Sequence, residues 1–113
     1  MERVIIAKAV TTLEELLGAL NNAYWEAINI HQKDTLFDVI TSLHEELNEL
    51  AKLSVEDHDM AYEPITLTFR SCCRKLKYLA SKIDEWFPRT STAEQLEHTV
   101  TEAAALISNQ CLR

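Results

Sequence analysis

Apolar residues recur at intervals of three and four along most of this 113-residue chain, the spacing that places them on one face of an α-helix. The pattern predicts four amphipathic helices, over residues 11–31, 35–53, 64–87 and 91–111. The polar breaks between them are short, so consecutive helices should be antiparallel neighbours. We therefore expect an all-α protein, an antiparallel up-down-up-down four-helix bundle, formed as one domain by residues 1–113.

Local sequence signals suggest where these helices begin. Thr11 and Thr12 each precede a glutamate by three positions, as does Ser91, and this spacing is typical of an N-terminal capping box. Asp34 is the expected cap of the second helix, and Pro64 suits the first turn of the third. The first ten residues, MERVIIAKAV, are rich in β-branched side chains and form a short N-terminal extension that is a strand, a packing arm or added helix.

The composition supports a folded helical chain. It is 47% hydrophobic and 26% charged, with one glycine and two prolines, which is too apolar for disorder and too poor in turn residues for a many-stranded sheet. No apolar run approaches the ~20 residues of a membrane span, and no secretion signal begins the chain. These features predict a cytoplasmic protein, and three cysteines without a secretion signal predict reduced thiols.

Charge is distributed unevenly along the chain, whose formal net charge is −7. Residues 11–63 carry twelve acids and two lysines, whereas residues 64–89 carry six basic residues and two acids. Arg70, Arg74 and Lys77 follow one another at helical spacing and would form a basic ridge. The ridge either attracts the acidic first hairpin of its own bundle or binds a carboxylate or phosphate group of a partner.

A second candidate site is the acidic run in the second predicted helix. Glu45, Glu46 and Glu49 form an EExxE pattern, and carboxylates three and four positions apart can hold a cation from one helix face. The run resembles the Mg²⁺-binding half of the all-α nucleotide pyrophosphohydrolases of the MazG type. The family's other half is an ExxD pattern on a following helix. In this chain residues 81–84 read SKID, with serine in place of the glutamate, and the ExxD of residues 56–59 lies too close to Glu49 to begin a facing helix.

Other reactive residues show no catalytic arrangement. The four histidines have no metal-ligand spacing among themselves, and Cys72, Cys73 and Cys111 fall on stripes otherwise occupied by aliphatic residues, where cysteine is usually a small core residue. Aromatic pairs end the first and third predicted helices, at residues 24–25 and 86–87, and either plug the core or flank a common groove.

The absence of a complete catalytic set favours a non-enzymatic role without a cofactor. We expect a regulatory or accessory module that acts through protein–protein interaction, with a protein partner or a second copy as a homodimer. Direct contact with nucleic acid or membrane is not expected of so acidic a chain. One alternative is a Mg²⁺-dependent pyrophosphohydrolase-like enzyme centred on Glu45, Glu46 and Glu49. Another is an acidic decoy that mimics nucleic acid for a basic partner.

Overall fold

The computed structural model describes residues 4–107, which form an all-α helical bundle as the sequence predicts. Within this range there are five α-helices and one short 3₁₀ helix, η1. Their bounds are α1 (Ile6–Glu26), α2 (Ile30–Ala51), η1 (Val55–Asp59), α3 (Leu67–Arg70), α4 (Cys73–Trp86) and α5 (Thr90–Leu106). No helix in the described part of the chain is both long enough and apolar enough to cross a bilayer.

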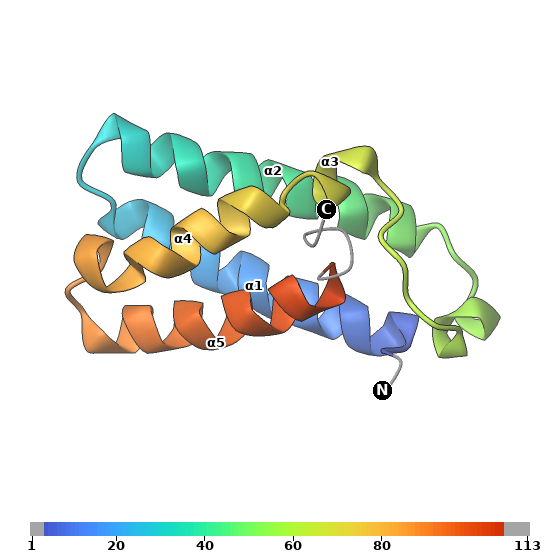
Figure 1. Cartoon of the computed structure of the whole chain (residues 1–113). Helices are drawn as coiled ribbons and strands as arrows, with labels where there is room; N and C mark the ends of the chain where they lie inside the picture. The colour runs from blue at the N-terminus through green and yellow to red at the C-terminus, as the bar shows by residue number, and fades with distance from the viewer. Residues whose placement is uncertain (1–3, 108–113) are drawn as a thin grey trace.

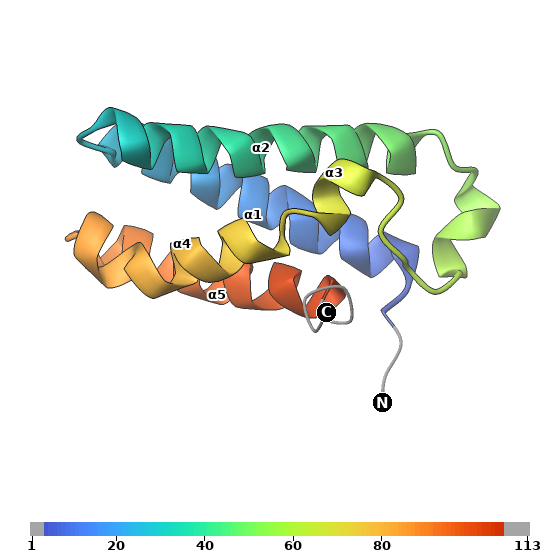
Figure 2. The same ribbon diagram turned by 45° about the horizontal axis from the view of Figure 1, so that its top comes forward.

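The chain runs the length of the bundle and reverses at each connection between long helices (Figure 1). α1 and α2 form one antiparallel hairpin, α3 and α4 run back along the bundle, and α5 returns beside α4 and α1 (Figures 1 and 2). α1 contacts α2 and α5, and α4 contacts α5 and α2, so the four long helices surround a common core. The largest fully buried side chains are mainly leucines: Phe69, Phe87, Leu13, Leu16, Leu20, Leu36, Leu43, Leu50, Leu76, Leu79, Leu96 and Ile107.

The first helix begins five residues earlier than its predicted start at residue 11. The Thr11 hydroxyl donates to the carbonyl of Ala7 at 3.3 Å instead of capping the helix, and Thr12 is buried within it. The apolar stripe continues backwards through Ala9 and Ile6, so burial extends the helix past the threonines. Residues 6–10 of the N-terminal extension are therefore helix, and residues 1–3 lie outside the described range.

The turn between α1 and α2 also differs from the prediction. Asn29, rather than Asp34, caps α2, because its side chain accepts a hydrogen bond from the N–H of Gln32 at 2.9 Å. The Gln32 side chain in turn accepts from the N–H of Ile28 at 3.0 Å, which closes the turn. His31, expected at the end of the first helix, therefore lies in the first turn of α2.

The predicted third helix, residues 64–87, starts later and is interrupted. Thr66 caps α3 by accepting from the N–H of Phe69 at 3.1 Å, so Pro64 precedes the helix and is not in its first turn. The N–H of Cys72 bonds to the carbonyl of Phe69 at 3.0 Å, a tight 3₁₀-type bond that separates α3 from α4. Residues 61–66 are extended because their polar groups bind elsewhere, as described below.

α5 begins one residue before its predicted start, and its N-cap residue Arg89 makes no side-chain capping hydrogen bond. The proposed capping box at Ser91 is wrong, since this residue lies inside the first turn. The helix ends at Leu106, and Cys111 lies outside the described residues.

An isolated antiparallel bridge between Ile5 and Ala61 ties the start of α1 to the segment after η1. The N–H of Ile6 donates to the carbonyl of Met60 at 2.9 Å, and the N–H of Tyr62 donates to the carbonyl of Val4 at 2.7 Å. This contact fixes one end of the long connection between α2 and α3.

Candidate functional site

Glu46 is fully buried, and its carboxylate accepts four hydrogen bonds from the connection between α2 and α3. One oxygen accepts from the Tyr62 hydroxyl at 2.6 Å and the Ile65 N–H at 2.8 Å. The other accepts from the Thr66 N–H at 2.9 Å and the Thr66 hydroxyl at 3.0 Å. Hydrogen bonds to an ionised acceptor are stronger than neutral ones, so Glu46 is a principal anchor of the connection.

Burial and the contact with Glu46 also change the pKa of Tyr62. Burial of its ring, followed by its hydrogen bond to Glu46 and the nearby negative charge, raises the pKa of the Tyr62 hydroxyl well above its ordinary value. Tyr62 is therefore held as a neutral donor to Glu46. This site is a structural anchor rather than a pair poised for proton transfer.

The structure divides the three glutamates of the acidic motif between different environments. Glu46 points inward, where both oxygens are occupied by protein donors, whereas Glu45 and Glu49 lie at the rim of a hollow of about 430 Å³. Glu49 also pairs with Lys52 at 2.8 Å. Among the residues that the structure describes, no group of three or more acidic, histidine or cysteine side chains is placed to hold a metal ion.

The predicted basic ridge is split between two helices. Arg70 ends α3, and its guanidinium Nε donates to the carbonyl of Pro64 at 2.9 Å. Arg74 and Lys77 are exposed on α4, and their side chains form no hydrogen bond or ion pair with a described residue. Arg70 therefore supports the connection before α3, while Arg74 and Lys77 remain available to a partner.

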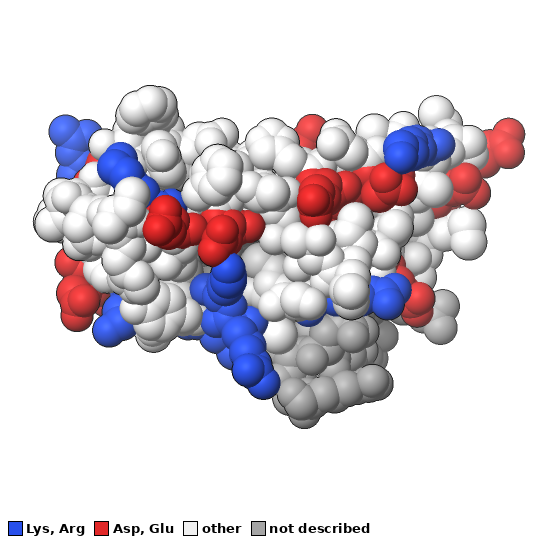
Figure 3. Space-filling view, turned by 90° about the horizontal axis from the view of Figure 1, so that it is seen from above, with Lys and Arg blue, Asp and Glu red and all other residues white. Residues whose placement is uncertain are grey.

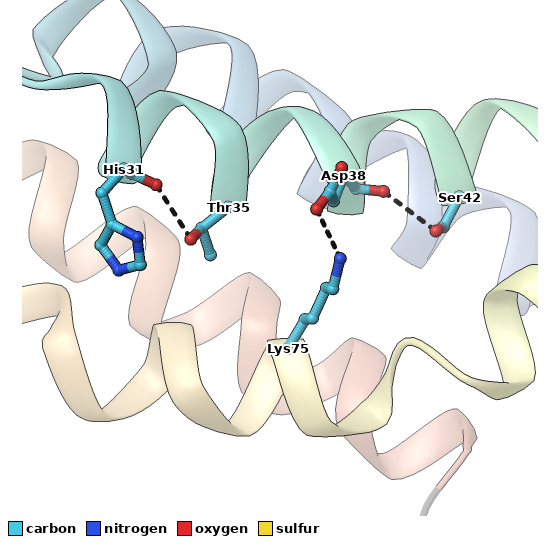
Figure 4. Close-up of polar contacts among 5 residues, drawn as sticks. All are labelled: His31, Thr35, Asp38, Ser42 and Lys75. Carbon is cyan, nitrogen blue, oxygen red and sulfur yellow. Dashed lines mark hydrogen bonds and ion pairs between the residues drawn. The ribbon is translucent and has the colours of Figure 1, made fainter.

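A neighbouring basic residue joins α4 to the acidic hairpin of its own chain. Lys75 pairs with Asp38 of α2 at 2.5 Å, as Figure 4 shows. α2 and α4 also meet at His31, whose ring lies 3.0 Å from the Tyr78 hydroxyl and packs edge-to-face against Trp86. Both Lys75 and Asp38 are half-exposed, so the pair adds at most about 1 kcal/mol and mainly aligns the two helices.

Acidic side chains line one face of the bundle. Figure 3 shows them in a row along the face that carries α2, with basic side chains gathered beside one part of the row. Such a distribution steers charged partners more than it stabilises the fold.

The adjacent cysteines, Cys72 and Cys73, are both buried at the junction of α3 and α4. Their environment agrees with the core role predicted for them.

Three strongly exposed apolar residues lie at the end of the bundle formed by the α1–α2 turn. Trp25 is 81% exposed, Ile28 84% and Ile30 72%, and we refer to these three residues as the end surface. Trp86 and Phe87 are buried instead, so the aromatic pairs do not flank a common groove as one alternative held.

A hollow of about 720 Å³, the end hollow, lies beside the end surface between α1 and the start of α5. Its lining is Asn22, Trp25, Glu26, Ile28, Pro88, Arg89, Ser91, Thr92 and Gln95. The Glu26 carboxylate accepts a hydrogen bond from the Thr92 hydroxyl at 2.5 Å, and this bond links α1 to α5 within the hollow. The hollow therefore combines an apolar wall with polar groups from both helices.

The end surface is hard to predict from the sequence, because Ile28 continues the apolar spacing of the first predicted helix, 11–31, and this spacing favours a core position. The signal that places it outside is Asn29, a preferred N-cap residue standing between two isoleucines. α1 ends at Glu26, so Ile28 is not on the helix and its side chain does not follow the buried face of α1.

Comparison with known proteins finds no matching family model, no matching curated protein and no matching solved structure.

Proposed function

We propose that this protein acts through protein–protein interaction, and that the end surface is its principal contact site. The observation that carries the proposal is that Trp25, Ile28 and Ile30, close in sequence around the α1–α2 turn, are each more than 70% exposed, and that Trp25 and Ile28 line the same hollow. Scattered exposed apolar residues are ordinary, but a contiguous group that includes tryptophan is typical of a binding site.

The energetic argument favours a partner at this position. Removing a large apolar side chain from water contributes about 1.5–3 kcal/mol, and tryptophan is among the residues that most often dominate binding energy. Covering three such side chains would supply several kcal/mol before the cost of association. The end hollow beside them offers a concave surface into which a partner's side chains can pack.

The exposed part of the basic ridge, Arg74 and Lys77, is proposed as a second contact for acidic groups of a partner. Rim charges of this kind accelerate association and contribute less to affinity than buried apolar anchors. In this proposal Arg70 has a structural role, because its Nε is bonded to Pro64.

The proposal can be tested by affinity capture from lysate at physiological salt, followed by native mass spectrometry of the eluted chain. We expect the wild-type chain to retain a partner protein or further copies of itself, and the Trp25→Ser, Ile28→Ser double variant to lose them. The Arg74→Glu, Lys77→Glu variant should bind more weakly and with a smaller dependence on salt.

Glu97→Lys, on the exposed face of α5, is the matched surface control and should retain the same species as the wild type. All variants should first give wild-type circular dichroism, which their exposed positions allow. A wild-type chain that stays at 12.9 kDa and retains nothing would contradict the proposal. If the Trp25→Ser, Ile28→Ser variant retains the same species as the wild type, the end surface is not the contact site.

A further inference from the structure

The end hollow carries one positive and one negative side chain. The negative one, Glu26, already accepts a hydrogen bond from Thr92, whereas the side chain of the positive one, Arg89, forms no hydrogen bond or ion pair with a described residue. Arg89 stands beside Pro88 and across from Trp25 and Ile28. The complementary ligand is therefore a segment that carries both apolar side chains and carboxylates.

Such a segment is present at the opposite end of this same chain. Residues 54–60, which we call the acidic loop, contain η1 and lie at the far end of the bundle from the α1–α2 turn (Figure 1). Val55 is 86% exposed and Met60 59% exposed, and Glu56 and Asp59 are exposed between them. The third acid, Asp57, is held by Ser54 in a capping box.

We infer that the end hollow receives the acidic loop of a second copy of this chain, with the apolar side chains of the loop against Trp25 and Ile28 and its carboxylates facing Arg89. The inference rests on the proposed function and names the partner at that site. Both features are exposed, the loop supplies carboxylates that the unpaired Arg89 side chain can bind, and each carries large apolar side chains that nothing in the described chain covers.

The contact joins two different surfaces of the chain, so it is isologous where two copies make it twice and heterologous where each copy uses a different neighbour for each surface. Two copies lying antiparallel can make it twice and close a homodimer, and other arrangements give rings or chains of copies. Within one chain the two surfaces are at opposite ends, so the contact forms only between chains. Association should therefore depend on protein concentration and weaken as salt rises.

The test uses sedimentation velocity on three forms of the full chain. A hollow variant, Trp25→Ser with Arg89→Glu, keeps the acidic loop intact. A loop variant, Val55→Ser with Glu56→Lys, keeps the end hollow intact. We expect each variant alone to self-associate about tenfold or more weakly than the wild type, the effect of losing an anchoring side chain and an opposite charge.

Sedimentation of the two variants mixed together is the decisive experiment, because each variant supplies the surface that the other lacks. The mixture is expected to form a one-to-one complex in which the hollow of the loop variant receives the loop of the hollow variant. Glu97→Lys, which brings the same change of charge as Glu56→Lys on another face, should associate like the wild type. Circular dichroism establishes that each variant is folded.

A wild-type chain that remains monomeric to millimolar concentration would overturn the inference, as would variants that associate normally or a mixture that forms no complex. If the pure chain is monomeric yet the end surface still captures another protein, the inference fails and the proposed function stands. If the pure chain is monomeric and captures nothing, both fail.

Discussion

Substitution of Glu46 by glutamine should destabilise the protein strongly although it changes only one polar atom. The two carboxylate oxygens of Glu46 accept two hydrogen bonds each, from Tyr62, Ile65 and Thr66. The glutamine side chain retains one acceptor oxygen and replaces the other with an amide group that can only donate. The backbone N–H on that side then faces another donor, whereas the Tyr62 or Thr66 hydroxyl can turn to accept from the amide.

The magnitude follows from those lost bonds. A hydrogen bond to an ionised acceptor contributes about 1.5–3 kcal/mol and one to a neutral acceptor about 1 kcal/mol, so losing one bond and making the other three neutral costs about 3–6 kcal/mol. Burying a neutral amide is less costly than burying a carboxylate, which moves the expected value toward about 3 kcal/mol. Total stabilities of 5–15 kcal/mol are typical of small proteins, so this loss is a large fraction of the whole.

Urea denaturation followed by circular dichroism at pH 7 measures the free energy of unfolding of wild type and variant. Hydrogen exchange supplies a local readout, because the amides of Ile65 and Thr66 should lose protection before the rest of the bundle. Glu45→Gln is the control, since an exposed carboxylate on the same helix should change stability by less than about 0.5 kcal/mol. If Glu46→Gln lies within 1 kcal/mol of the wild type, the reasoning about this buried carboxylate is refuted.

Three further predictions concern other positions. Gly18→Ala should raise the free energy of unfolding by about 0.5–1 kcal/mol, because Gly18 is exposed inside α1 and an added Cβ meets nothing within 4 Å; a fall measured in urea would contradict this. The raised pKa of Tyr62 means that above about pH 10 the unfolded chain releases this proton while the folded chain keeps it. Stability should therefore fall as pH rises there, and melts of Tyr62→Phe should show a shallower fall. Mg²⁺ should leave the melting temperature unchanged, and a rise that disappears in Glu45→Gln, Glu49→Gln would instead support the enzyme alternative.

The choice of that last variant follows from the structure. A test of metal binding that removes Glu46 would unfold the connection between α2 and α3 whether or not the protein binds metal. Glu45 and Glu49 line the hollow of about 430 Å³ and form no hydrogen bond with the residues that Glu46 anchors. Their substitution therefore changes the candidate metal ligands and leaves the Glu46 hydrogen bonds in place.

The bundle itself was predictable because burial repeats along each helix. Residues such as Leu13, Leu43, Leu76 and Leu96 recur at helical spacing, are buried in the structure, and identify the inward faces without knowledge of the neighbours. The reversal of the chain between helices follows from the shortness of most connections.

The helix ends and the candidate sites were harder to predict because they depend on contacts distant in sequence. Thr66 begins α3 because Glu46, twenty positions earlier, accepts the hydrogen bonds of the residues before the helix. The EExxE spacing reports that Glu46 shares a helix with Glu45 and Glu49, but it does not report that Glu46 faces inward. Ile28 has the spacing of a core residue, but it lies between the C-cap of α1, Ala27, and the N-cap of α2, Asn29.

The central claim, that the end surface is covered by a protein partner, can be tested through Trp25 itself. The chain has two tryptophans, of which Trp25 is exposed and Trp86 is buried, so acrylamide quenches them to different extents. A Trp25→Phe chain isolates the fluorescence of Trp86. The account predicts strong quenching of Trp25 in dilute chain and protection of Trp25 in assembled or partner-bound material. Equal accessibility of Trp25 in the free and bound forms would contradict it.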